Sequence, residues 1–392
     1  MKIGIDARMF GPAVGGGGLG RYVEQLVDQL QKQDLENRYV LFLKRENFDT
    51  CVITNPNFEK RLADAHWYTA KEQVLMPLLI ERERLDLIHF PHWNVPLLCR
   101  TPFVVTIHDL ILLEQPVSSK TTTRGPLVHW LKRIGYRISL WHAIVASKRI
   151  VAVSEYTKSS IGRFFPGIES SKVEVVYEGV TGLAVATRDD HPYPLLPMRR
   201  GNEEYVLYVG NAYPHKNLDS LLDAFAMFSK AHPGVELVLA GRDDVFYRRL
   251  RDARRPPLTP PPYEEGKRDN VRFVMNPTDA ELAELYRGAS LYVFPSKSEG
   301  FGLPPLEAMS MGIPVASSNA TCLPEILGDA ATYFSPDRVD EMADAMERGY
   351  SDERLRAELI AKGREQIKKY SWAAMARSIL NLYGNVAYRE TE

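Results

Sequence analysis

The chain has 392 residues, of which 45% are apolar and 25% charged, the balance of a soluble globular protein. This length exceeds what one hydrophobic core usually organises, so we expect two domains. The formal net charge of -1 shows no basic excess, which argues against a nucleic-acid-binding protein. The three cysteines lie far apart in the sequence, so neither a disulfide framework nor a zinc site is indicated.

The start of the chain carries no targeting signal that we can identify. Asp6 interrupts the first apolar run, so we expect no signal peptide. The sequence contains no apolar run as long as the about eighteen residues that a membrane-spanning helix needs. We therefore predict a cytoplasmic protein, whose membrane contact, if it has one, is peripheral and at the inner face of the cytoplasmic membrane.

Short β-branched runs alternate with longer amphipathic segments along the whole chain. Nearly continuous apolar strands of this kind are typical of parallel sheets that helices cover on both faces. The predicted strands are 2–6, 39–43, 87–90, 103–107, 150–153 and 173–176 in the first half, and 205–209, 235–240, 271–275, 291–294 and 313–316 in the second. We predict an α/β protein with two Rossmann-like, doubly wound sheets.

Two proline-rich polar stretches interrupt this pattern. Residues 186–204 contain three prolines and no apolar periodicity, which predicts a linker between an N-terminal domain, 1–185, and a C-terminal domain, 205–370. The second stretch, 254–270, lies inside the second half and is interpreted as an inserted surface loop. The tail from about residue 352 has a helical pattern with apolar side chains along one face.

A glycine cluster follows the first predicted strand. Gly17 and Gly18 belong to this cluster and precede a predicted helix that begins near Arg21. Bare backbone N–H groups at the positive end of a helix receive phosphate well. The spacing matches neither the Walker motif nor the strict dinucleotide motif, so a loop without a ligand is an equally good interpretation.

His108 and Asp109 follow the predicted strand 103–107. Ligands of open α/β sheets bind at the carboxyl ends of strands, so both side chains are placed to contact one. His108 could donate a hydrogen bond to a sugar hydroxyl or to a leaving phosphate oxygen. The alternative is a His–Asp pair that orders the loop. His89 and His92 are weaker candidates for the side of the site that receives an acceptor.

The predicted strand 205–209 runs into Gly210 and Asn211, and the following turn presents His215 and Lys216 just before a helix. A cation at this place can neutralise a diphosphate, and the start of the helix adds to its field. The alternative is a surface lysine without a ligand.

Two carboxylates eight positions apart, Glu299 and Glu307, give the strongest local signal. Gly300 and Gly302 between them allow the backbone to approach a ligand closely, and Pro304 favours the first turn of a helix. One carboxylate can bind sugar hydroxyls and the other a ribose diol. The alternative, two solvated acids at a helix start, is less favourable, because burying acids without such partners is costly.

At these residues the sequence resembles retaining glycosyltransferase family 4, which has the GT-B fold. The Glu-x7-Glu motif from Glu299 to Glu307 is the signature of that family, and the glycine-rich start, the Ile-His-Asp turn and the Pro-His-Lys-Asn segment match it in order. The resemblance covers nearly the whole chain. It implies two Rossmann-like domains that face each other across a cleft, with a C-terminal helix, 371–392, that returns to the N-terminal domain.

The resemblance also implies roles for the candidate residues. Gly17 and Gly18 would face the donor diphosphate, Lys216 would hold it, and Glu307 would bind the ribose. His108 would contact the sugar near its anomeric carbon. Glu299 would hold the donor sugar and phosphate together with the backbone of a short segment, Gly300, Phe301, Gly302 and Leu303.

The chain departs from the family at two positions. Many relatives carry an arginine where this sequence has Asn211 or His215. Neutralisation of the diphosphate would then depend on Lys216, or on another arginine such as Arg242.

The expected reaction is the transfer of a hexosyl group from a nucleoside diphosphate sugar to a hydroxyl of a glycan or polyprenyl-linked glycan, with retention of configuration. The resemblance is greatest to bacterial mannosyltransferases of surface polysaccharide assembly, so GDP-mannose is the expected donor. The sequence contains no Asp-x-Asp triplet, so we expect neither a metal nor another cofactor. The alternatives are a UDP-sugar donor, a phosphorylase or epimerase of the same architecture, and a non-catalytic nucleotide-sugar-binding protein.

Residues 120–149 indicate where a membrane could bind. Between Gln115 and Ser154 there is no acidic residue, while lysines and arginines alternate with apolar and aromatic residues. A basic amphipathic segment can lie on an anionic membrane, where a lipid-linked acceptor would be found. The alternative is an ordinary core helix with a solvated basic face.

Overall fold

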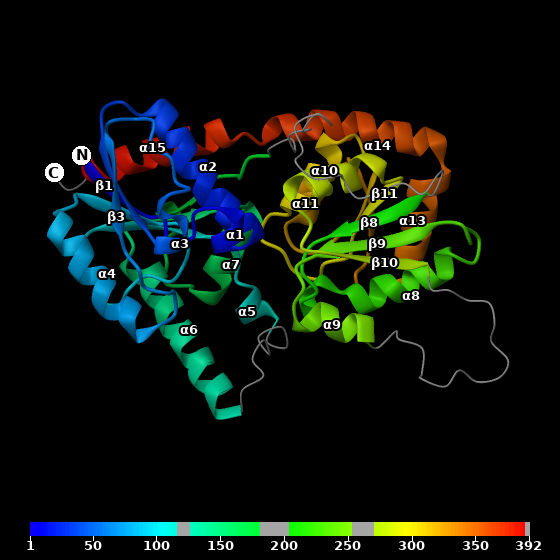
Figure 1. Cartoon of the computed structure of the whole chain (residues 1–392), viewed down its shortest axis with the longest axis horizontal. Helices are drawn as coiled ribbons and strands as arrows, with labels where there is room; N and C mark the ends of the chain where they lie inside the picture. Colours follow the sequence, from blue (N-terminus) through cyan, green and yellow to red (C-terminus); the bar gives the residue numbers. More distant parts are fainter. Residues whose placement is uncertain (116–125, 181–203, 253–269, 389–392) are drawn as a thin grey trace. The chain divides into compact units, whose positions relative to one another are not determined.

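The computed structural model describes residues 1–115, 126–180, 204–252 and 270–388. The chain divides into two compact units (Figure 1). Unit 1 comprises Met1–Leu113, Ser119–Gly179 and Tyr370–Glu392, and unit 2 comprises Glu114–Ser118 and Val180–Lys369. The linker predicted at 186–204 and the loop predicted at 254–270 lie, except for their last residues, outside the described residues.

Unit 1 contains a seven-stranded sheet in which each strand is parallel to its neighbours. Along the sheet the strands are β3 (Phe58–Leu62), β2 (Arg38–Leu43), β1 (Lys2–Asp6), β4 (Leu87–Phe90), β5 (Phe103–Ile107), β6 (Arg149–Ala152) and β7 (Val173–Val175). The central strand β1 is paired on both sides, with Ile3 opposite Tyr39 of β2 and Leu87 of β4. The order reverses at β1, so the carboxyl ends of β1 and β4 mark the switch point where ligands of such sheets bind.

The long helices of unit 1 are α2 (Gly17–Gln33), α4 (Ala70–Glu83), α6 (Pro126–Ala146), α7 (Glu155–Phe164) and α15 (Trp372–Tyr388), and the short ones are α1 (Pro12–Gly15), α3 (Arg45–Phe48) and the 3-10 turn η1 (Ser170–Lys172). A further short helix, α5 (Ile111–Glu114), ends where unit 1 gives way to unit 2. The last helix, α15, packs beside α2 although the two stand at opposite ends of the chain (Figure 1). Its apolar face is buried as the pattern of the tail predicted, with Met375, Ile379 and Leu382 at most 1% exposed.

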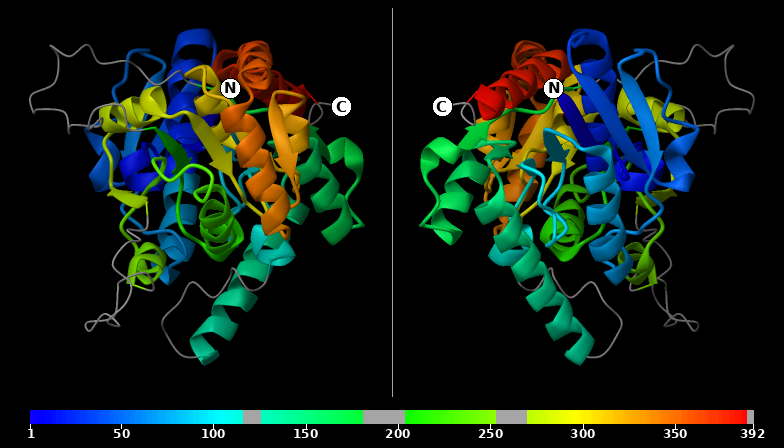
Figure 2. Two further views of the ribbon diagram at one scale, coloured as in Figure 1. Left: turned by 90° about the vertical axis from the view of Figure 1, so that its right-hand side faces the viewer. Right: turned by 90° about the vertical axis from the view of Figure 1, so that its left-hand side faces the viewer.

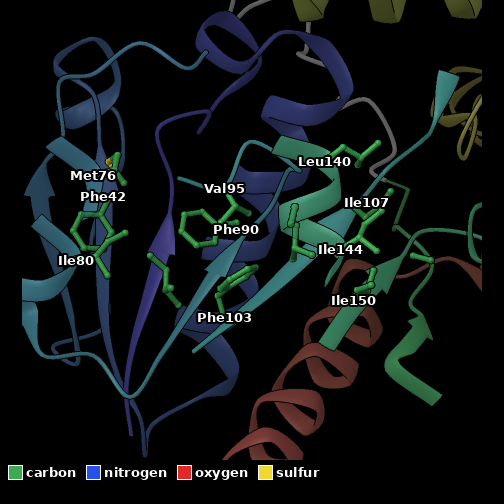
Figure 3. Close-up of a cluster of buried hydrophobic side chains, with 14 of the residues drawn as sticks. Phe42, Met76, Ile80, Phe90, Val95, Phe103, Ile107, Leu140, Ile144 and Ile150 are labelled. Atoms are coloured by element: carbon green, nitrogen blue, oxygen red, sulfur yellow. The ribbon is translucent and has the colours of Figure 1, made fainter. Parts of the chain in front are cut away.

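The core of unit 1 lies between the sheet and its helices. Figure 3 shows Phe42, Phe90 and Phe103 from three strands beside Leu140 and Ile144 from α6. Each of these side chains is buried, and burying one stabilises the fold by about 1.5–3 kcal/mol. The C-terminal part of α6 is therefore anchored in the core.

Unit 2 contains a six-stranded sheet, again with every neighbouring pair parallel. Its strands in spatial order are β10 (Val271–Met275), β9 (Glu236–Gly241), β8 (Tyr205–Val209), β11 (Leu291–Phe294), β12 (Val315–Ser318) and β13 (Ala331–Phe334). The order reverses at β8, whose carboxyl end is followed by Gly210.

Helices pack on both faces of this sheet, with α8 against α13 and α11 against α14, and Figure 1 shows α8 and α9 on the face opposite α10 and α11. The helices and turns of unit 2 are η3 (Pro214–Lys216), α8 (Leu218–Phe228), α9 (Val245–Asp252), α10 (Asp279–Gly288), α11 (Leu303–Ser310), α12 (Leu323–Leu327), α13 (Val339–Ser351), α14 (Glu353–Gln366) and η4 (Ile367–Lys369).

Several helices begin where the sequence supplies a capping side chain. Ser154 accepts a hydrogen bond from the Thr157 amide at the start of α7, at 3.1 Å. Thr278 and Glu281 form a reciprocal capping box at the start of α10. Such caps satisfy amides that have no partner inside the helix, so they fix where the helix begins.

The fold prediction of two parallel α/β sheets is confirmed. Every predicted strand is present, with bounds that agree or shift by one or two residues. Two strands were missed, β3 and β13, and each lies at the edge of its sheet.

Candidate functional site

The loop that follows β8 brings a cation to the carboxyl edge of the unit 2 sheet. The Tyr208 hydroxyl donates to the Asn211 carbonyl at 2.7 Å, and Asn211 Oδ1 accepts from the Tyr213 amide at 3.2 Å. The turn then continues through η3 to Lys216. The His215 carbonyl accepts from the Lys297 amide at 2.7 Å, so this loop is tied to the loop that follows β11.

Lys216 and Glu299 form an ion pair across these two loops, with Nζ donating to Oε1. Both side chains are nearly buried, at 14% and 11% exposure. The Lys216 ammonium also lies 5.7 Å from the centroid of the Phe294 ring. The structure thus brings together two of the predicted site residues, although 83 positions separate them.

The segment between the two acids forms a tight turn into α11. Gly302 has φ 103, a left-handed conformation that favours glycine, and it is the residue that precedes the helix. Phe301 and Leu303 beside it are buried. The turn into α11 therefore depends on the left-handed conformation of Gly302.

Two residues that directly precede α12 (Leu323–Leu327) hold the turn through hydrogen bonds. The Glu299 amide donates to Thr321 Oγ1 at 3.1 Å. The Cys322 thiol donates to the carbonyls of Glu299 and Phe301 at 3.4 and 3.3 Å. Burial raises the pKa of the Cys322 thiol well above its ordinary value, and the Glu299 charge adds to this, so the thiol stays protonated as a donor.

Glu307 lies one turn into α11 and is 7% exposed. Its Oε2 accepts a hydrogen bond from the Tyr286 hydroxyl at 3.2 Å. Tyr286 belongs to α10 and is fully buried. The Tyr286 hydroxyl therefore orients the Glu307 carboxylate.

Both acids lie near one buried phenol, Tyr292 of β11. Burial raises the pKa of Tyr292 well above its ordinary value, and the charges of Glu307 and then Glu299 raise it further. The Tyr292 hydroxyl donates to the Val209 carbonyl at 3.2 Å, just before Gly210. The two carboxylates are therefore grouped around the carboxyl end of β8, the switch point of the unit 2 sheet.

His215 does not add charge to this group. Burial, reinforced by the neighbouring Lys216 charge, lowers the pKa of His215 to about 4. The ring is therefore neutral at neutral pH, and its buried Nδ1 has no hydrogen-bond partner among the described residues. Lys216 is then the cation of this turn. Arg242, which follows the neighbouring strand β9, is exposed, and its charge reaches Tyr213 of the same loop.

In unit 1 the predicted glycines lie at the start of a long helix. Gly17 is the first residue of α2 and has φ 36, and both Gly17 and Gly18 are exposed. A Cβ added at Gly17 would meet nothing within 4 Å. The helix was predicted to begin near Arg21, but it begins four residues earlier, so both glycines belong to its first turn and not to a loop before it.

His108 is held by acceptors at both of its ring nitrogens. Nδ1 lies 2.9 Å from Glu178 Oε1, and Nε2 lies 2.9 Å from the Pro91 carbonyl oxygen. The Pro91 carbonyl can only accept, so Nε2 donates to it, and a second donated hydrogen bond from Nδ1 to the Glu178 carboxylate requires the imidazolium form of the ring. Burial would lower the pKa of His108, but the hydrogen bond and charge of Glu178 outweigh it and raise the pKa above the ordinary value.

Asp109 also holds its own loop. Its Oδ1 accepts a hydrogen bond from the Ile111 amide at 3.0 Å, at the start of α5. The pair that orders His108 is formed with Glu178, which follows β7.

His89 was predicted as a candidate for the acceptor side, and this prediction is wrong. His89 lies within β4 and is fully buried, with Nδ1 2.6 Å from the Tyr383 hydroxyl and Nε2 2.8 Å from Thr106 Oγ1. Burial lowers the pKa of His89 to about 3, so the ring is a neutral link between the sheet and α15.

Four residues of the site were not predicted from the sequence: Glu178, Tyr286, Thr321 and Cys322. Glu178 follows a strand, so the rule that ligands bind at the carboxyl ends of strands could have selected it. The other three act through contacts that only the folded chain creates. Within the described ranges no group of three His, Cys, Asp or Glu residues is arranged to hold a metal ion, and no helix has both the length and the apolarity to cross a bilayer.

The two units correspond to two known families. Residues 16–181 match the family described as Glycosyltransferase Family 4, and residues 198–366 match the family described as Glycosyl transferases group 1. Together these regions span most of the chain.

A characterised relative and two solved structures are similar over nearly the full length. O-antigen chain mannosyltransferase B of Escherichia coli is 28% identical, over 93% of this chain and 95% of its own. Sucrose-phosphate synthase from Thermosynechococcus elongatus aligns with a TM-score of 0.74 at 21% identity, over 98% of this chain and 99% of its own. Anabaena HepE, solved with UDP and glucose, aligns with a TM-score of 0.71 at 17% identity, over 98% and 100%.

These similarities agree with the two parallel α/β sheets of the chain. The chain is a GT-B glycosyltransferase and belongs to glycosyltransferase family 4.

Proposed function

We propose that this protein transfers a mannosyl group from GDP-mannose to a hydroxyl of a glycan or lipid-linked glycan, with retention of anomeric configuration and without a metal ion. The observation that carries the proposal is the grouping of Lys216, Glu299 and Glu307 at the carboxyl end of β8. The mannosyl donor is supported by the relative named an O-antigen chain mannosyltransferase.

In the proposed complex the leaving diphosphate replaces Glu299 as the ion-pair partner of Lys216. The amides of Gly300, Phe301, Gly302 and Leu303 at the start of α11, and of Gly17 and Gly18 at the start of α2, supply further donors to its oxygens. Fixed donors of this kind stabilise developing negative charge without having to reorganise. Lys216 is the charged member of the set, because His215 is neutral.

Glu299, once released from Lys216, would accept hydroxyl groups of the donor sugar. Glu307 would accept the ribose hydroxyls, oriented by the Tyr286 hydroxyl. Gly210 and Asn211 would line the nucleotide from the β8 loop. His108 would present its imidazolium to the sugar near the anomeric carbon, which requires Nε2 to exchange the Pro91 carbonyl for the ligand. Asp109 would keep the His108 loop in place.

Among the described residues that we place around the donor, none is proposed to attack the sugar as a nucleophile. We therefore propose that the acceptor hydroxyl attacks from the same face that the diphosphate leaves. The bond from the anomeric carbon to the phosphate oxygen breaks, its electron pair stays with the diphosphate, and the acceptor proton passes to the leaving oxygen. Isolation of a covalent glycosyl-enzyme would contradict this step.

We propose further that α6 contacts an anionic membrane, where a lipid-linked acceptor is found. Trp130, Ile138, Trp141 and Val145 recur on one helical face and are 40–57% exposed. Lys132, Arg133 and Arg137 of the same helix are exposed as well. Figure 2 shows the N-terminal end of α6 (teal) projecting past the other elements of unit 1. Exposed aromatic and basic side chains on one helix favour the interface of a bilayer.

The donor is tested by nucleotide protection. The melting temperature of the protein is measured with GDP, UDP, GDP-mannose and UDP-glucose, each at a large excess. A ligand at a hundred times its Kd stabilises by about 2.7 kcal/mol, which a thermal scan resolves. We expect GDP and GDP-mannose to protect more than the uridine compounds, and the reverse order would replace mannose by a UDP-sugar such as those seen with HepE. Proton NMR of the glycoside product then gives the anomeric configuration.

A further inference from the structure

Two aromatic rings lie stacked at the carboxyl edge of the unit 1 sheet, apart from the residues discussed so far. Tyr68 and Trp93 have ring centroids 5.0 Å apart and planes inclined by 23°. Tyr68 stands after β3 and Trp93 after β4, so two loops of the same sheet edge contribute one ring each. Tyr68 is 56% exposed and Trp93 is half-buried, so the pair presents a ring surface to solvent.

The backbone of Tyr68 is held in an unfavourable conformation. Its φ is 64, in the left-handed region that residues with a side chain avoid. The Tyr68 amide donates to Glu72 Oε2 at 2.7 Å, which fixes this conformation. Because the ring is exposed, the conformation is not explained by core packing. Strain of this kind is typically retained where a side chain must be presented to a ligand.

A buried charge network lies beneath the two rings. Arg8, 1% exposed, forms ion pairs with Asp6 at 2.7 Å and with Glu72 at 2.6 Å. Glu72 Oε1 also accepts from Asn94 Nδ2 at 2.9 Å. Glu72 therefore fixes the Tyr68 loop with one carboxylate oxygen and the loop of Trp93, through Asn94, with the other.

The network also sets the proton position on His92, whose ring lies beside the stacked pair, with centroids 4.8 Å from Trp93 and 6.2 Å from Tyr68. His92 Nδ1 is 2.9 Å from Asn94 Oδ1, and since the Asn94 amide nitrogen donates to Glu72, this oxygen must be the acceptor. Burial, with the charge of His108, lowers the pKa of His92 to about 3, so the ring is neutral. Nδ1 then carries the single ring proton, and Nε2 is left as an acceptor with a free lone pair.

The chemistry of this surface fits a neutral sugar ring. Aromatic faces carry partial negative charge and attract the weakly positive C–H groups of a pyranose, while an acceptor nitrogen beside them can take a sugar hydroxyl. An anion is disfavoured, because the positive charge of Arg8 is buried and already paired twice. The surface also adjoins the proposed reaction centre, because the Pro91 carbonyl, one residue before His92, is bound to His108.

We propose that Tyr68, His92 and Trp93 form an acceptor subsite that binds a neutral pyranose by stacking on the two rings and by a hydroxyl hydrogen bond to His92 Nε2. Glu72, Asn94 and Arg8 are positioning residues for it. The assignment rests on the proposed glycosyl transfer, to which it adds the place where the acceptor sugar binds.

Fluorine NMR with fluorinated tryptophan tests the subsite without any turnover. The chain has five tryptophans, each of which is assigned by replacement with phenylalanine. Methyl glycosides of mannose, glucose, galactose and N-acetylglucosamine are titrated one at a time. We expect the Trp93 signal to shift saturably with at least one glycoside, while the Trp372 signal stays constant.

The matched variant is Tyr68→Gly, which removes the ring and suits the left-handed backbone, so it is expected to fold with an undiminished melting temperature. Its apparent Kd for the glycoside should rise by about tenfold or more, the loss of a hot-spot aromatic contact. Tyr68→Phe, which keeps the ring, should bind as the wild type does. Phe164→Ala, which removes a partly exposed ring at the end of α7, is the control and should have no effect.

Three results would overturn the subsite. They are a Trp93 signal that no glycoside moves, an equal response in Tyr68→Gly, and a response to GDP or UDP alone in place of the glycosides. Protection of the same protein by nucleotides is measured in parallel. Nucleotide protection without a Trp93 response removes the subsite and leaves the proposed function intact, whereas absent nucleotide protection removes the proposed function itself.

Discussion

The ammonium group of Lys216 is paired with the carboxylate of Glu299, its neighbour across the β8 and β11 loops. The cation expected to receive the donor diphosphate is therefore already neutralised. Binding of the donor must replace Glu299 by phosphate, and the same exchange frees the Glu299 carboxylate for sugar hydroxyls. One ion pair thus links recognition of the phosphate to recognition of the sugar.

Replacement of this carboxylate should separate the two kinds of recognition. In Glu299→Gln the diphosphate no longer competes for Lys216, and an ion pair worth about 1 kcal/mol corresponds to about fivefold tighter binding of GDP. Sugar transfer should nevertheless fall by about a hundredfold or more, because a group that contacts the reacting sugar is lost. Titration calorimetry gives the affinity and product release gives the rate.

Glu307→Gln is the comparison for this variant. Its carboxylate is paired with Tyr286 and not with Lys216, so its loss should weaken GDP binding. If both variants weakened GDP to the same extent, the competition between Glu299 and the diphosphate would be refuted.

The ion pair between His108 and Glu178 predicts a pH dependence of stability. The folded state raises the pKa of His108 above its ordinary value of about 6.5, so it binds the proton more tightly than the unfolded state does. The resulting stabilisation is complete below about pH 6.5 and is lost as the pH rises through the raised pKa. The free energy of unfolding, measured by urea titration from acid to alkaline pH, should show this loss in the wild type and much less of it in Glu178→Gln. A constant difference between the two proteins across the range would contradict the assignment of the proton to His108.

Gly302 should be indispensable to the turn that precedes α11. Its φ of 103 is costly for any residue with a side chain, and an added Cβ would lie 2.9 Å from Leu323 Cδ2. We expect Gly302→Ala to destabilise unit 2 by about 1–2 kcal/mol, from the left-handed conformation alone. Gly162→Ala is the control, because Gly162 lies inside α7 with open space around it and should gain about 0.5–1 kcal/mol. Urea denaturation distinguishes a loss from a gain, and an unchanged Gly302→Ala protein would refute the strain.

The exposed face of α6 predicts binding to anionic vesicles. Each basic residue near such a surface contributes about 1 kcal/mol, so changing Lys132, Arg133 and Arg137 to Glu should weaken binding by about a hundredfold or more. The matched control changes Arg38, Arg82 and Arg100, three exposed arginines elsewhere in unit 1, to Glu with the same change of charge. Sedimentation with phosphatidylglycerol vesicles measures both. Equal losses in the two triple variants would mean that only net charge matters, and failure of the wild type to bind would end the membrane proposal.

How much of the fold the sequence predicts depends on where each strand lies. The central strands were found because burial on both faces makes them nearly continuous apolar runs. β3 reads Phe-Glu-Lys-Arg-Leu and was missed, because an edge strand is partly solvated and carries charged side chains. β13 is an edge strand of unit 2 and reads Ala-Thr-Tyr-Phe, which contains no continuous run of β-branched apolar residues.

The candidate site was partly predictable for the same reason. Glu299, Lys216 and His108 follow predicted strands, and the carboxyl-end rule selects such residues. Side-chain partners are a different matter, because they join positions remote in sequence. His89 could have faced either a ligand or the core, and its hydrogen bond to Tyr383, 294 residues away, decides for the core. The stacking of Tyr68 and Trp93 could likewise not be predicted from the sequence, because it depends on two loops that meet only in the folded chain.

The most direct test of the account is release of nucleoside diphosphate from GDP-mannose by Lys216→Ala, measured beside Lys297→Ala. Lys297 belongs to the neighbouring loop, but its ammonium pairs with Asp337. We predict that Lys216→Ala lowers the rate by about a hundredfold or more, since it removes the cation that meets the leaving charge, and that Lys297→Ala keeps the wild-type rate. Equal rates in the two variants would contradict the claim that Lys216 holds the donor diphosphate.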